Sequence, residues 1–72
     1  MMYEYQIKGF TLSELQKPKE EQEPIFNETF FAITSSTALR RAEEEAGLQG
    51  VSSNVACYNI IMKTKLPNGG IK

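Results

Sequence analysis

Residues 25–34 read IFNETFFAIT and residues 55–63 read VACYNIIMK, and these two stretches decide the fold. Both are rich in aromatic and β-branched residues, so we expect two β-strands. In each stretch apolar residues occupy both alternating sets of positions, which predicts apolar side chains on both faces of a sheet. Apolar surface on two faces needs two covers, one for each face.

A single helix is the only cover that the pattern of the chain offers. Residues 37–46 (TALRRAEEEA) follow Ser35 and Ser36, either of which can cap a helix, and precede Gly47, a typical C-terminal stop. The apolar stripe of this helix is mostly alanine, which allows close packing on a sheet but buries little area. We therefore expect it to cover one face only, and we predict that strand surface is left over for a partner.

The first strand precedes these elements and has one wet face. Apolar and polar residues alternate over residues 3–8 (YEYQIK), as in a half-buried strand. The predicted order is ββαβ, an α+β domain with a three-stranded, mainly antiparallel sheet and one helix packed on one face. We expect a right-handed crossover and the strand order 2-1-3. The domain spans residues 1–63, and residues 64–72, which are rich in structure breakers, form a flexible tail.

Residues 11–24 connect the first two strands. Thr11 and Glu14 have the spacing of a capping box, in which the Glu side chain reaches back to the cap amide. This predicts a single helical turn over residues 12–17 that Pro18 ends. The rest is almost wholly polar and charged, so we expect a mobile, solvated loop, although a connection of this length can also be functional.

The composition argues against catalysis. The 72 residues include no His, the commonest general base and metal ligand, and all nine acids are Glu. Cys57 has no histidine to activate it and is expected to be a small buried hydrophobe. We predict no catalytic residue, no cofactor and no metal site, and hence a protein that is not an enzyme.

The same composition bears on location. A single cysteine within an apolar run suits a reducing compartment. No run approaches the roughly 18 apolar residues of a membrane span, and the N-terminus does not resemble a signal peptide. We expect a cytoplasmic protein without a membrane segment.

The leftover strand surface predicts a non-enzymatic protein-binding module. A chain of 72 residues has a small core, and a symmetric dimer would enlarge it by setting one patch against itself. A homodimer is therefore the simplest expectation, with a foreign protein as the other partner. Small chains of this kind are typical of accessory or inhibitor proteins of bacteria and phages. The expected contact residues are Phe26, Phe30, Tyr58, Ile60 and Met62, or else the alternating set on the same two strands.

The charges on the helix offer a second candidate contact. Arg40 and Arg41 lie toward its N-terminus and three glutamates toward its C-terminus, opposite to what the helix dipole favours. One interpretation is a solvated outer face. The other is that the arginine pair anchors a partner.

Nucleic-acid binding is the alternative function. Aromatic side chains with interspersed lysines on an open sheet face can stack on bases. The net charge of −1 lacks the basic excess that phosphate binding requires, so this alternative is the weaker one. Its candidate residues are Tyr3, Tyr5 and Tyr58 with Lys8, Lys63 and Lys65.

Overall fold

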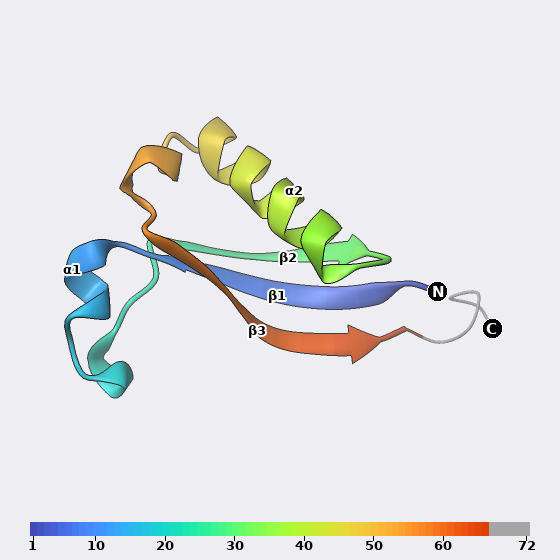
Figure 1. Cartoon of the computed structure of the whole chain (residues 1–72), viewed down its shortest axis with the longest axis horizontal. Coiled ribbons are helices and arrows are strands. Elements are labelled where there is room, and N and C mark those ends of the chain that lie inside the picture. The colour runs from blue at the N-terminus through green and yellow to red at the C-terminus, as the bar shows by residue number, and fades with distance from the viewer. Residues whose placement is uncertain (67–72) are drawn as a thin grey trace.

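The computed structural model describes residues 1–66 as one α+β unit with a three-stranded open sheet. The strand order is β2-β1-β3, and both pairings are antiparallel, which confirms the predicted ββαβ arrangement. Figure 1 shows α2 lying across one side of this sheet. Along the chain the elements are β1 (Tyr3–Phe10), α1 (Leu12–Leu15), η1 (Lys19–Glu21), β2 (Phe26–Ala32), α2 (Ser35–Leu48), η2 (Ser52–Asn54) and β3 (Cys57–Lys65).

The central strand β1 provides the middle of the core. Tyr5 and Ile7 are fully buried on the side that faces α2. Their neighbours Gln6 and Lys8 project to the opposite side, as the alternation predicted. We call the two sides the helix-facing side and the outer face.

Helix α2 packs through alanines. Ala38, Ala42 and Ala46 are fully buried, because a methyl side chain lets the helix backbone approach the sheet closely. The helix is capped by Thr34, whose hydroxyl accepts a hydrogen bond from the Thr37 amide at 3.3 Å. The prediction of Ser35 or Ser36 as the cap was therefore wrong by one or two positions.

The C-terminal end of α2 differs from the prediction as well. Gly47 lies inside the helix, and it is Gly50 that adopts a positive φ of 78°. The Val51 amide donates to the Ala46 carbonyl at 3.0 Å, and the Gly50 amide donates to the Gly47 carbonyl at 3.1 Å. These two bonds form a Schellman motif, which requires a positive φ at the residue after the C-cap. That residue is Gly50, which follows the C-cap residue Gln49.

Strand β3 starts later and ends later than predicted. It runs Cys57–Lys65, and Lys65 still pairs with Tyr3 of β1. The register shifts by one residue between Gln6 and Ile7 of β1, because Ile60 pairs with Ile7 whereas Met62 pairs with Gln6. Ile61 is the extra residue of this β-bulge. The tail was predicted to begin at residue 64; its residues 67–72 lie outside the described part of the chain.

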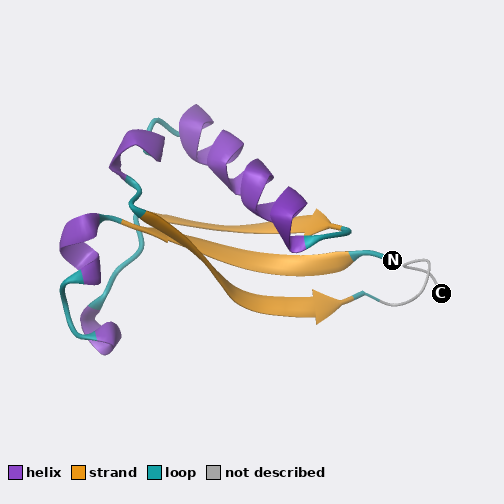
Figure 2. Cartoon of the chain, in the orientation of Figure 1, coloured by secondary structure: helices purple, strands orange, loops and turns teal. Residues whose placement is uncertain are grey.

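The connection between β1 and β2 folds on itself at one end of the sheet, away from the N-terminus (Figure 2). The Thr11 hydroxyl accepts from the Glu14 amide at 3.3 Å, which is the first half of the predicted capping box. Glu14 does not reach back to Thr11; its carboxylate accepts from the Glu23 amide at 3.0 Å and from the Lys17 ammonium at 2.9 Å. The mobility predicted for this loop stays a prediction.

The molecule is long and thin. Its principal extents are 43 × 26 × 16 Å, and its Cα radius of gyration is 13.4 Å. A compact chain of this length has a radius of gyration of about 11 Å. One sheet with one helix on one side leaves the other side of the sheet largely uncovered.

Candidate protein-binding surface

The predicted contact residues do not form one surface. Phe26 is only 2% exposed, and its ring stacks on Phe30 at 6.2 Å and meets Tyr58 edge-on at 6.0 Å between centroids. These three rings lie on the helix-facing side, where Phe30 and Tyr58 are half-buried. Phe26 therefore belongs to the core, which leaves its side chain little surface to offer a partner.

The bulge separates the other two predicted residues. Ile60 pairs with the buried Ile7 and shares its helix-facing side, whereas Met62 pairs with Gln6 on the outer face. The alternating set supplies further exposed side chains on the outer face, namely Phe31 and Ile61. Exposed apolar groups are thus present on both sides of the sheet.

The outer face has a polar centre with apolar flanks. Gln6 of β1 lies between Thr29 of β2 and Met62 of β3, and Glu4 lies between Phe31 and Thr64. The strand order predicted this arrangement, since β2 and β3 are the two edges. The outer face therefore carries one apolar patch at each edge and no continuous one.

The edge formed by β2 is closed by the helix. The Arg41 guanidinium donates from Nη1 to the Phe31 carbonyl at 2.8 Å. The Gln49 amide donates from Nε2 to the Glu28 carboxylate at 2.9 Å. Arg41 is therefore hydrogen-bonded within the chain through Nη1, although its side chain is exposed, and the contact predicted for the arginine pair stays a prediction. Arg40 is exposed on the outer side of the helix.

The edge formed by β3 is open. No described residue pairs with its outer side. Near its start, burial and, to a lesser degree, the charge of Glu43 raise the pKa of Tyr58. Further along, Ile60, Ile61 and Met62 are 36%, 48% and 56% exposed. An edge strand with exposed backbone and apolar side chains is a template for strand addition.

The second half of β3 carries lysines on the helix-facing side. The Lys63 ammonium lies 4.4 Å from the centre of the Tyr3 ring and 5.7 Å from that of Tyr5, in cation–π geometry. Tyr5 is fully buried and Tyr3 half-buried. The tyrosines of the predicted nucleic-acid platform thus lie under or beside the helix, and no open face presents them together for stacking.

Few side chains among residues 1–66 are suited to metal binding or thiol chemistry. No group of acidic or cysteine side chains within residues 1–66 could hold a metal ion. Cys57 is half-buried, and its thiol lies 3.3 Å from the Asn59 carbonyl oxygen Oδ1. Among the same residues no helix has the length and apolar character to cross a bilayer.

Comparison of the chain with protein-family models, with curated proteins and with solved structures finds no match. Function is therefore inferred from the surface of the chain itself. Sequence reasoning named most of its residues but missed the bulge, which is a property of strand register and has no local signal.

Proposed function

We propose that this chain is a non-enzymatic protein-binding module that self-associates through the free edge of β3. One observation carries the proposal: Ile60 on the helix-facing side and Ile61 and Met62 on the outer face are exposed at the same point of one edge strand. Contact through the outer face would cover only two of these side chains. Pairing of the edge covers exposed side chains on both sides, because it extends both sides of the sheet at once.

The pairing that fits is antiparallel and symmetric, since a two-fold axis sets the same strand against itself. Before the bulge, residues 57–60 of β3 keep a regular register with β1, and Ile61 is the bulge residue that follows. An axis at Asn59 places Tyr58 opposite Ile60 of the second copy on the helix-facing side. It places Cys57 opposite Ile61 of the second copy on the outer face. The two sheets join into one, with both α2 helices on the same side.

The features that protect an edge strand from pairing lie in the second half of β3, so we place the pairing in the first half. Bulges and lysines that point inward discourage strand addition. In β3 both occur after Ile60, with Lys63 held over the Tyr3 ring. Pairing centred on Asn59 leaves these lysines outside the joined segment, so no like charges meet.

The first test is the mass in solution, by light scattering over a dilution series. We expect a rise from the 8.1 kDa of one chain toward twice that value as concentration increases. Ile60→Glu places a charge in the proposed interface and should abolish the rise. Phe31→Glu, a matched change at an exposed position of β2, should leave it intact. A monomer at every concentration contradicts self-association, and loss of the dimer only in Phe31→Glu assigns it to the outer face.

The second test fixes the register. In a Cys57→Ser background, Asn59→Cys sets two thiols opposite each other, with Cα atoms about 4.5–5.5 Å apart, which is disulfide distance. We expect a covalent dimer under mild oxidation. Thr64→Cys is the control, because residue 64 lies outside the paired segment. Equal yields from both variants would contradict the register.

A further inference from the structure

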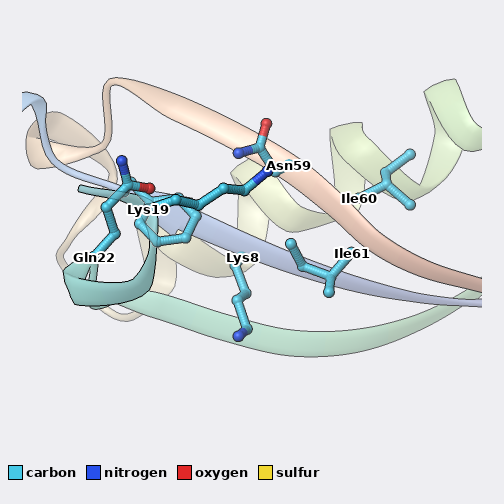
Figure 3. A pocket seen from close by; sticks show the side chains of 7 residues that line it. Lys8, Lys19, Gln22, Asn59, Ile60 and Ile61 are labelled. Carbon is cyan, nitrogen blue, oxygen red and sulfur yellow. The ribbon is translucent and has the colours of Figure 1, made fainter. Parts of the chain in front are cut away.

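A pocket lies between the connection from β1 to β2 and the outer face of the sheet. Its volume is about 550 Å³. Sites for small ligands usually have volumes of roughly 300–1,000 Å³. Figure 3 shows Lys19 extending from η1 toward Asn59 of β3, whereas Lys8 extends from β1 toward β2, away from Lys19. The lining residues are Lys8, Phe10, Lys19, Gln22, Asn59, Ile60 and Ile61.

The wall that the connection contributes is held by hydrogen bonds. The Gln22 side-chain amide donates from Nε2 to the Leu15 carbonyl at 3.4 Å and to the Lys17 carbonyl at 3.1 Å. At the exit of the connection, the Ile25 amide donates to the Gly9 carbonyl at 2.9 Å. The Gln22 bonds join the two halves of the connection to each other, and the Ile25 bond joins its end to β1.

The rim of the pocket is cationic. Neither Lys8 nor Lys19 lies in salt-bridge contact with a carboxylate of residues 1–66, where the ion pair is Lys17 with Glu14. Glu20 and Glu21 follow Lys19 in the chain but do not line the pocket. Lys8 and Lys19 therefore both line one pocket in a protein whose net charge is −1.

Asn59 adds a hydrogen-bond donor, and the floor is apolar. The Asn59 oxygen Oδ1 faces the Cys57 thiol at 3.3 Å, which leaves the NH₂ group of Asn59 free to donate. The NH₂ group of Gln22 is already used within the connection. Phe10, which is only 6% exposed, and Ile61 form the apolar floor of the pocket.

We propose that this pocket binds a small organic anion, a carboxylate joined to an aliphatic body. The carboxylate would accept hydrogen bonds from Lys19 and Asn59, whose side chains lie together in Figure 3, and the body would cover Phe10 and Ile61. Such a group can come from a free carboxylic acid or from the C-terminus of a peptide that ends in an apolar residue. The pocket lies within one chain, so the stoichiometry is one per chain whether or not the protein dimerises.

The test is a titration of amide chemical shifts with sodium octanoate, with 1-octanol as the uncharged probe of equal chain length. We expect octanoate to shift the amides of Lys8, Phe10, Asn59 and Ile61 and octanol to bind more weakly. Lys19→Gln should lower the affinity for octanoate roughly tenfold, by removing a charge-assisted hydrogen bond. Lys8→Gln should lower it less, because the Lys8 ammonium points away from Lys19 and Asn59. Lys65→Gln is the control, since Lys65 pairs with Tyr3 and shares its helix-facing side.

A second arm uses N-acetyl-glycyl-leucine, a peptide acid with an apolar end, and the tighter of the two ligands identifies the source. Several outcomes overturn the proposal: equal binding of octanol and octanoate, shifts centred on Phe31 rather than the pocket, or no loss of affinity in Lys19→Gln.

Discussion

The two edge strands, β2 and β3, have similar sequences but differ in how far their residues are buried. Both carry apolar residues on both alternating sets of positions. In β2, Phe26 and Ala32 are buried, and the helix bonds to its free edge. None of the nine residues of β3 is buried. How much of a strand that is apolar on both faces becomes buried therefore depends on where the helix lies.

The length of the connections explains why α2 packs on β2 rather than on β3. Helix α2 starts at Ser35, three residues after β2 ends at Ala32, so the helix must turn back over the strand it follows. Strand β3 begins nine residues after α2 ends at Leu48, and this link, which includes η2, carries the chain to the far side of β1. Figure 1 shows α2 on the β2 side of the sheet. The short connection sets which edge is covered.

The largest expected effect on stability is at β2, the edge strand that has buried residues. Phe26→Ala removes a core ring, and such truncations cost about 3–5 kcal/mol. A domain of this size has only about 3–5 kcal/mol of stability, so we expect the variant to be largely unfolded. Ile61→Ala on β3 should change the free energy of unfolding by less than about 1 kcal/mol. Urea unfolding and amide spectra measure both, and similar losses for the two variants would refute the contrast.

A smaller effect is expected where the helix closes the β2 edge. Arg41→Gln removes the hydrogen bond to the Phe31 carbonyl, and a typical bond of this kind contributes about 1 kcal/mol. Arg40→Gln is the matched control and should stay within about 0.5 kcal/mol of the wild type. Urea unfolding compares the two. If Arg40→Gln is as costly as Arg41→Gln, the helix does not close that edge through Arg41.

The smallest effect concerns the flank of α2 that faces β3. Burial, and to a lesser degree Glu43, raises the pKa of Tyr58. The contribution of Tyr58 to stability is thus fully present below its unfolded pKa of about 10. It is lost as the pH rises through the higher folded pKa, because the unfolded state then releases its proton first.

Absorbance titration of the tyrosines checks this. Tyr58→Phe should remove the group that titrates late and reduce the loss of stability in alkali. Glu43→Gln should lower the pKa of Tyr58 only part of the way, since burial is the larger cause. An unchanged titration in Glu43→Gln would mean that this flank of the helix is not beside β3.

Much of the fold followed from local pattern. The period of two over residues 3–8, the two apolar stretches and the alanine stripe predicted three strands and one helix near their observed positions. Connection lengths predicted the order 2-1-3. The cap at Thr34 and the stop at Gly50 were missed, because several neighbouring residues could have served and only the final backbone angles select one.

The site was less predictable than the fold. Sequence placed Phe26 with Ile60 and Met62, but packing sends Phe26 into the core, and the bulge sends Ile60 and Met62 to opposite sides. The pocket under the connection was not foreseen at all. It depends on Gln22 bonding to carbonyls of its own loop, which are backbone groups that leave no mark on the sequence.

By itself the sequence determined the elements and the fact that one alanine-lined helix cannot cover strands that are apolar on both sides. Only the tertiary structure decided which surface stays uncovered. Helix position follows from a short connection, and the side on which each strand residue lies follows from register, which a single bulge residue changes. Both are relations between distant parts of the chain, so no local pattern encodes them.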